Sequence, residues 1–186
     1  WSVLLKWNGC SVAITFTTEQ KKLFCMRWFI HNGVVEWLCK WIWFGVINMK
    51  VLVSACIMGT NCKYNGKNNK NLAVINFLKD KEVISICPEV LAGMKIPRPC
   101  AEIVNGIVVD ENGNDVNSEY NKAVSMALSK IQNEDIDLVI LQSRSPTCGV
   151  NQIYDGSFTG KLISGMGFFA KALKQRGYNV IDVEEV

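Results

Sequence analysis

The sequence predicts a small α/β domain in residues 49–186, with three layers and a mainly parallel sheet whose strands are joined by crossover helices. Two observations predict this fold class. Short runs rich in β-branched residues alternate with longer segments whose apolar residues recur at helical spacing. The chain is also 186 residues long, which suits one compact domain with an appendage.

The expected elements follow one another along this domain, and each ends at a recognisable signal. They are a strand at 50–55, a helix at 71–79, a strand at 82–86, a hairpin or excursion at 103–116, a helix at 118–131, a strand at 137–141, a helix at 167–175 and a strand at 179–183. Asn-Gly pairs at 105–106 and 112–113 indicate turns in the hairpin. Ser118 is the expected N-cap of the longest helix, and Gly177 ends the later one. We expect a sheet of four or five strands.

Residues 1–48 differ sharply in composition from the rest of the chain. All six tryptophans and the only histidine lie in this segment, which carries five Lys or Arg against two Asp or Glu. Residues 49–186 carry fifteen of each charge and are neutral. Because a balanced charge gives no long-range attraction to phosphates, we expect no nucleic-acid partner.

We expect residues 1–48 to be a leader outside the domain. The segment has no lasting periodicity, it opens on Trp1, and Met49 is followed at once by the first strand. Its most apolar run, 37–47, is interrupted by Lys40 and is far shorter than the ~20 residues of a membrane span. Upstream sequence read in frame, and not native coding sequence, is the favoured interpretation. A membrane-surface or targeting segment and a structural extension are the alternatives. No membrane association is expected for 49–186.

The domain contains five of the eight cysteines, and their number and setting argue against disulfides. The number is odd, the pattern is α/β, and no secretory signal is evident. We therefore expect free thiols in a reducing compartment and a cytoplasmic protein.

Three of these cysteines follow strands. Cys56 comes directly after the first strand, Cys87 directly after the second, and Cys148 in the loop after the third. Loops beyond the carboxyl ends of parallel strands form the ligand crevice of such sheets, so the three thiols should meet at one edge.

Thiolates without histidine suit an iron–sulfur cluster or zinc. Structural zinc would need Cys62 or Cys100 as a fourth ligand. Three thiolates on a four-iron cluster leave one iron open as a Lewis acid. Buried core cysteines are the alternative.

Two further residues should border the same crevice. Glu89 lies two positions after Cys87, and Ser145 lies three positions before Cys148. A carboxyl group there can hold or deliver protons, and a hydroxyl can donate to a developing anion. Alternatively, Glu89 only complements the dipole of a helix that begins at Pro88. Arg98 could bind an anion or pair with Glu102.

Several blocks of residues 49–186 together resemble the thiouracil desulfurase family, a group long catalogued as a domain of unknown function. The matching blocks are Val53-Ser54-Ala55-Cys56-Ile57-Met58-Gly59, Lys63-Tyr64-Asn65-Gly66, Cys87-Pro88-Glu89-Val90-Leu91-Ala92-Gly93, Pro97-Arg98-Pro99, Ala101-Glu102-Ile103, Ser145-Pro146-Thr147-Cys148-Gly149 and Ile153-Tyr154-Asp155-Gly156. The sequence departs from the family pattern at Asn65, where aspartate is usual, at Gln142, where lysine is usual, and at Cys100, where a small residue or proline is common.

The resemblance implies an iron–sulfur enzyme that takes sulfur from a small-molecule thiolated base. It implies a [4Fe-4S] cluster held by Cys56, Cys87 and Cys148, with Glu89 and Ser145 as the expected catalytic residues. The implied reaction removes sulfur from a thiolated pyrimidine such as 2-thiouracil without redox change, releases sulfide, and uses the open iron to take the sulfur. One alternative is a metal-binding module, with a cluster or zinc serving structure or sensing. Another is a thiol-based redox enzyme that uses Cys56 with Cys62.

Overall fold

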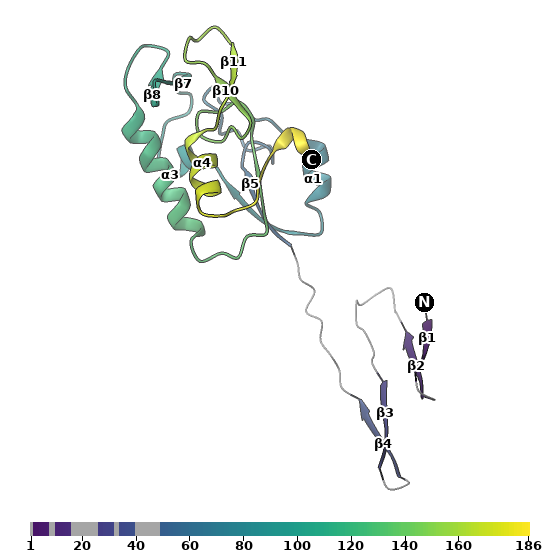
Figure 1. The fold of residues 1–186 in the computed structure, drawn as a ribbon. Helices are drawn as coiled ribbons and strands as arrows, with labels where there is room; N and C mark the ends of the chain where they lie inside the picture. The colour runs from purple at the N-terminus through teal and green to yellow at the C-terminus, as the bar shows by residue number, and fades with distance from the viewer. Residues whose placement is uncertain (1, 8–9, 16–25, 32–33, 40–48) are drawn as a thin grey trace. The chain divides into compact units, whose positions relative to one another are not determined.

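The computed structural model describes residues 2–7, 10–15, 26–31, 34–39 and 49–186. The chain divides into two compact units, residues 1–47 and residues 48–186. The second unit contains the α/β domain (Figure 1).

A parallel sheet of four strands lies at the centre of this domain. Its strands are β5 (Lys50–Ser54), β6 (Glu82–Ile86), β9 (Leu138–Leu141) and β12 (Val180–Asp182), in the order β12-β9-β5-β6. All three neighbouring pairs are parallel. After β6 the chain crosses to the other side of β5, which places the topological switch point between β5 and β9. The expected parallel sheet is confirmed.

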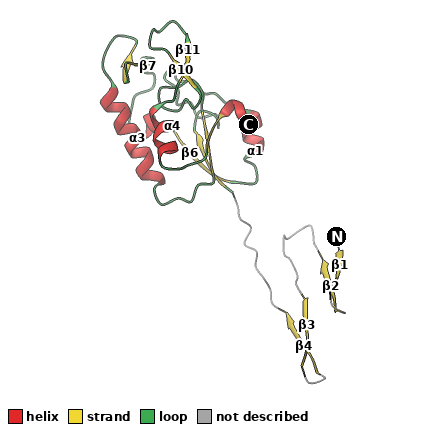
Figure 2. Cartoon of the chain, in the orientation of Figure 1, coloured by secondary structure: helices red, strands yellow, loops and turns green. Residues whose placement is uncertain are grey.

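Helices cover both faces of this sheet (Figure 2). Helix α1 (Leu72–Phe77) covers one face, and α3 (Asn117–Ile131) and α4 (Phe168–Gln175) cover the other. The three-layer prediction is therefore confirmed. Asn71 starts α1 by accepting hydrogen bonds from the N–H groups of Ala73 and Val74.

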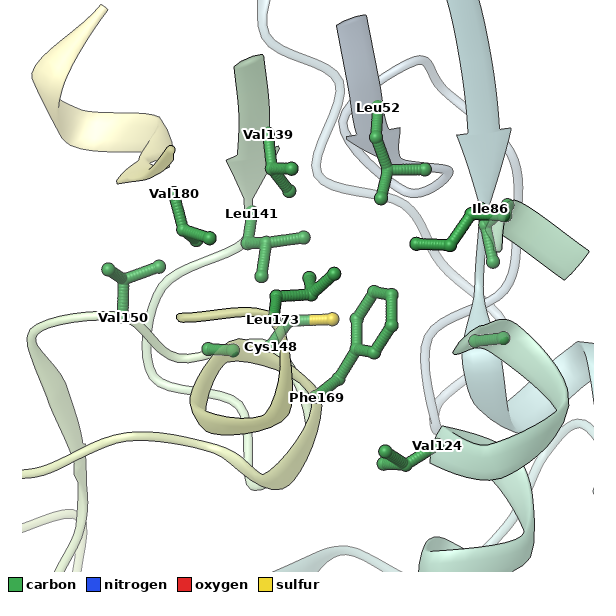
Figure 3. Close-up of a cluster of buried hydrophobic side chains, with 13 residues drawn as sticks. Leu52, Ile86, Val124, Val139, Leu141, Cys148, Val150, Phe169, Leu173 and Val180 are labelled. Atoms are coloured by element: carbon green, nitrogen blue, oxygen red, sulfur yellow. The ribbon is translucent and has the colours of Figure 1, made fainter. Parts of the chain in front are cut away.

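The apolar residues of the strands are divided between the two faces by the period of two. Val51 and Val53 pack toward the α1 side, whereas Leu52 packs toward α3 and α4. Figure 3 shows the buried cluster on the α3 and α4 side of the sheet. Phe169 of α4 lies there among side chains of the sheet, and the Cys148 sulfur points toward the Phe169 ring. Cys148 thus lies where the core meets the sheet edge.

The segments between β6 and β9 and between β9 and α4 add smaller elements. Helix α2 (Pro88–Leu91) follows β6, and β7 (Ala101–Val104) and β8 (Ile107–Asp110) form the expected hairpin around Asn105 and Gly106. A second hairpin, β10 (Gln152–Tyr154) with β11 (Leu162–Ser164), and a final 3-10 turn, η1 (Val183–Glu185), were not expected.

The expected N-cap of α3 is wrong. The helix begins one residue earlier, at Asn117, and Val116 occupies the cap position without a side-chain hydrogen bond. The Ser118 hydroxyl instead donates to the Glu119 carboxylate. The turn preceding α3 is held by Asp115, which accepts a hydrogen bond from the Asn117 N–H, so a local cap at Ser118 is not needed.

From the sequence, no strands were expected in residues 1–48. The described stretches of this segment form antiparallel hairpins, β1 (Ser2–Trp7) with β2 (Cys10–Thr15) and β3 (Met26–His31) with β4 (Val34–Cys39). Asn-Gly pairs at 8–9 and 32–33 separate these runs in the sequence, and such pairs are a strong hairpin signal. Helices that meet the length and hydropathy of a membrane span do not occur in the part of the chain that the structure describes.

Candidate metal centre

A cavity of about 490 Å³ lies at the carboxyl edge of the sheet. Its wall comes from segments that are distant in sequence: the end of β5, residues 62–64, the end of β6 with α2, residues 98–102, and the loop after β9. All five cysteines of the domain contribute to it: Cys56, Cys62, Cys87, Cys100 and Cys148. All five are free thiols.

A tight turn after β5 holds Cys56. The N–H of Ile57 donates to the Ser54 carbonyl, and the N–H of Gly59 donates to the carbonyl of Cys56. Gly59 has a φ of +97°, a conformation that disfavours residues with a side chain. The turn reverses the chain directly after β5 and keeps Cys56 at the edge of the sheet.

Cys87 is held by the start of helix α2. It occupies the N-cap position with extended backbone, and its carbonyl accepts the N–H of Leu91. Pro88 stands at the first helical position, where a missing N–H costs nothing. Strand β6 and helix α2 therefore meet at this cysteine.

Ser145 shapes the turn that carries Cys148. Its hydroxyl oxygen accepts hydrogen bonds of 3.1 Å from the N–H groups of both Thr147 and Cys148. Gly149 follows, and a Cβ there would lie 2.8 Å from the carbonyl oxygens of Ser145 and Gln152, so only glycine fits. Cys148 is consequently held in one position, with 6% of its surface exposed.

The thiols of this cavity influence one another. Hydrogen bonding to Cys56 is the main cause that raises the pKa of Cys62 to about 11. Hydrogen bonding to Cys62, followed by burial and the nearby Glu89, raises the pKa of Cys87. Burial raises the pKa of Cys148, with the charges of Glu89 and Cys87 adding to the effect. Three sequence-distant loops thus bring four thiols within interaction range.

Cys62 is closer to the predicted ligands than its sequence position suggested. The sequence interpretation placed it outside the set formed by Cys56, Cys87 and Cys148, and it directly adjoins two of them. No strand ends at Cys62, so the strand-end argument had no means of finding it.

Glu89 is buried beside Cys87, with 7% of its surface exposed. Its Oε2 accepts a hydrogen bond of 3.0 Å from the Cys87 thiol, and its Oε1 accepts one of 2.7 Å from the Thr147 hydroxyl. Sequence reasoning missed Thr147, which is fully buried. The Thr147 contact ties helix α2 to the loop after β9.

Arg98 does not pair with Glu102. One oxygen of the Glu102 carboxylate accepts the N–H groups of Gly156 and Phe158, whereas Nη2 of Arg98 donates to the Cys62 carbonyl at 3.3 Å. Among the described residues Arg98 therefore forms no ion pair with Glu102, which was one of the two roles expected for it.

The donor set of the cavity fits an iron–sulfur cluster. Thiolates are the usual ligands of such clusters, and the cysteines here come from separate loops around one cavity. Within the described parts of the chain, no three Cys, His, Asp or Glu side chains are grouped so as to hold a single metal ion. In a four-iron cluster each thiolate binds a different iron, so convergence on one point is not required.

Fold and site together define a small α/β domain with a thiol-lined cavity at the switch point of its sheet, where proteins of this architecture bind ligands. The sequence model of the 2-thiouracil desulfurase family matches residues 51–185. The chain belongs to this family and is an enzyme.

Two similar proteins extend the comparison. A solved structure described as a [4Fe-4S]-dependent thiouracil desulfidase, TudS, superposes with a TM-score of 0.68 at 31% identity, covering 75% of this chain and 93% of that one. The uncharacterized protein YbbK of Bacillus subtilis (strain 168) is 36% identical over 146 residues, which cover 73% of this chain and 97% of that protein. Their similarity supports the family assignment and the fold.

Proposed function

We propose that this protein removes sulfur from a thiolated pyrimidine such as 2-thiouracil by hydrolysis, using a [4Fe-4S] cluster bound by Cys56, Cys87 and Cys148. The observation that carries the proposal is the shared cavity, which these three cysteines line together with Glu89 and Ser145. Family membership and the description of the similar desulfidase agree with it.

The reaction needs no oxidant or reductant. Water supplies the oxygen that replaces sulfur on the pyrimidine carbon, the C–S bond breaks, and sulfide leaves with the protons of the water. A cluster with one iron free of protein ligands would supply a Lewis acid that polarises the C–S bond. The residues of the chain must then position the base and move protons.

Glu89 is the group that we assign to proton transfer. Its carboxylate is buried at the cavity wall, and Oε2 lies 3.0 Å from the Cys87 sulfur, next to the proposed cluster. The Thr147 hydrogen bond to Oε1 orients the carboxylate, and we assign proton transfer to Oε2, the oxygen on the Cys87 side. The domain contains no histidine, which leaves a carboxylate as the natural base near neutral pH.

Ser145 is the group that we assign to stabilising developing negative charge. Its oxygen already accepts two backbone N–H groups, which fixes the position of the hydroxyl. The hydroxyl hydrogen remains available for donation into the cavity. A donor held in place before the reaction loses no free energy in reorganising as charge develops.

We also propose that the protein works in the cytoplasm. Its five domain cysteines are free, and a cluster bound to thiolates requires that they stay reduced.

Anaerobic reconstitution with iron and sulfide tests this function. The purified chain should gain about four irons, a broad visible absorbance, and the ability to release sulfide from 2-thiouracil. Iron binding without sulfide release from any of a series of thiolated bases would instead favour a structural or sensing metal module. Zinc binding in place of iron would contradict the cluster.

A further inference from the structure

Arg98 holds the only buried side-chain nitrogens or oxygens, among the described residues, that have no hydrogen-bond partner. These atoms are Nε and Nη1, and the residue lines the cavity that contains the cysteines. Buried polar groups in proteins nearly always have partners, and an unpaired one that carries charge destabilises the fold strongly. The two unpaired nitrogens of Arg98 therefore indicate that a ligand in the cavity accepts hydrogen bonds from them.

The backbone around Arg98 fixes the guanidinium in place. The Arg98 N–H donates to the Tyr64 carbonyl at 2.8 Å, and Nη2 donates to the Cys62 carbonyl at 3.3 Å. Both partners line the same cavity. The Cys87 thiol donates to the same Cys62 carbonyl at 3.9 Å, so the guanidinium and this thiol share one acceptor.

The chemistry of the guanidinium limits what can bind to it. Arginine offers only donors and stays charged, so its free N–H groups can pair only with an acceptor atom of the ligand. Tyr64, Tyr120 and Tyr154 also line the cavity, so aromatic residues stand in its wall beside the guanidinium. Arg98 lies close enough to the Tyr120 hydroxyl to lower the pKa of that group, against the larger effect of burial, which raises it. The ligand that satisfies both features is a flat heterocycle bearing an exocyclic oxygen.

We propose that Arg98 binds the exocyclic oxygen of the thiolated pyrimidine and thereby selects oxo-substituted bases over amino-substituted ones. The inference rests on the proposed function for its ligand class. An amino group at that position would present its own hydrogens to a donor, leaving the buried guanidinium unpaired. Sites built to hydrogen-bond one substituent reject analogues that lack it strongly.

Equilibrium binding of two sulfur-free bases tests this selection. Both bases carry oxygen at C2, where 2-thiouracil carries its sulfur, and they differ at C4, where uracil has the exocyclic oxygen assigned to Arg98 and cytosine has an amino group. Calorimetric titration of the iron-loaded full chain should show uracil binding at least about 10-fold more tightly than cytosine. This comparison needs no variant, and equal affinities would overturn the proposal.

Arg98→Gln provides the second measurement. An amide can donate or accept, so uracil affinity should fall by about 10- to 100-fold while cytosine affinity changes little or rises. Arg176→Gln is the matched control: it removes the same charge from the exposed end of α4, where Nη1 only donates to the Ala172 carbonyl, and should leave both affinities unchanged. Iron content and thermal midpoint establish that each variant is folded.

Two variant outcomes would overturn the assignment: unchanged uracil affinity in a folded, iron-loaded Arg98→Gln protein, or equal weakening of both bases. Failure of the proposed reaction is separable from failure of this inference, because uracil has no sulfur to release. Uracil binding that depends on Arg98, without sulfide release from any thiolated base, would reject the desulfurase proposal and retain the role of Arg98.

Discussion

The hydroxyl of Thr147 donates a hydrogen bond of 2.7 Å to Oε1 of Glu89, between residues 58 positions apart in the sequence. The contact joins helix α2 to the loop after β9. Both residues are buried, so each of the two polar groups depends on the other for its hydrogen bond.

Thr147→Val should therefore destabilise the domain and lower turnover. Valine keeps the shape of threonine but leaves Oε1 of Glu89 without this donor, which should lower the free energy of unfolding by about 1–3 kcal/mol. Urea denaturation of the iron-loaded protein measures the loss. Thr147→Ser retains the hydroxyl and should recover most of it. Equal stability of the valine variant and the original protein would show that the bond contributes little.

Glu89→Gln separates proton transfer from folding. Glutamine retains a carbonyl oxygen to accept from Thr147 but cannot exchange a proton, so turnover should fall by roughly 10²–10⁴ with cluster absorbance retained. Steady-state sulfide release is the measurement, with Glu119→Gln on the exposed surface of α3 as control. Near-normal turnover would return Glu89 to a structural role at the start of α2. Loss of iron would mean that it supports the cluster.

Ser145→Ala should lower turnover by about 10²–10³ if the hydroxyl stabilises developing charge. The same change removes the acceptor of two backbone N–H groups, so iron content must be measured beside sulfide release. A variant that binds substrate and iron normally but turns over slowly supports the catalytic role. A variant that loses iron in proportion to activity supports a role in holding the Cys148 turn only.

Serine variants of the cysteines test the ligand set one residue at a time. Replacement of Cys56, Cys87 or Cys148 should each greatly reduce bound iron, whereas Cys100→Ser, in the same cavity wall, should retain it. Iron per chain after anaerobic reconstitution is the measurement. Cys62→Ser is the most informative variant because Cys62 adjoins Cys56 and Cys87. Loss of iron in that variant would contradict a cluster held by three thiolates.

Expression from Met49 tests the expectation that residues 1–48 lie outside the domain. The shortened protein should fold, bind iron and unfold at the same temperature as the full chain, because the composition changes abruptly at this point. Thermal unfolding followed by circular dichroism is the measurement. A loss of more than about 2 kcal/mol would indicate that the segment buries substantial apolar surface against the domain.

The sequence by itself determined the layers of the domain and the edge at which its cysteines gather. The β-branched run at 50–55 predicted a strand, and in the structure Val51 and Val53 face one side of the sheet and Leu52 the other, because side chains of a strand alternate by geometry alone. The predicted positions of Cys56 and Cys87 after strands were likewise enough to place them at one edge, since parallel strands end there, although β5 ends two residues before Cys56. Local signals were less reliable where a neighbouring residue offered a competing partner, as at Ser118.

Only the tertiary structure decided which side chains complete the site. Three of its contacts depend on loops that meet in space. Thr147 donates to Glu89, Cys62 lies near Cys56 and Cys87, and Arg98 donates to the Cys62 carbonyl and does not pair with Glu102. Periodicity and turn signals describe how a chain behaves over a few neighbouring residues. Contacts between loops depend on how the strands are ordered in the sheet and where the chain crosses it, and no local pattern records that order.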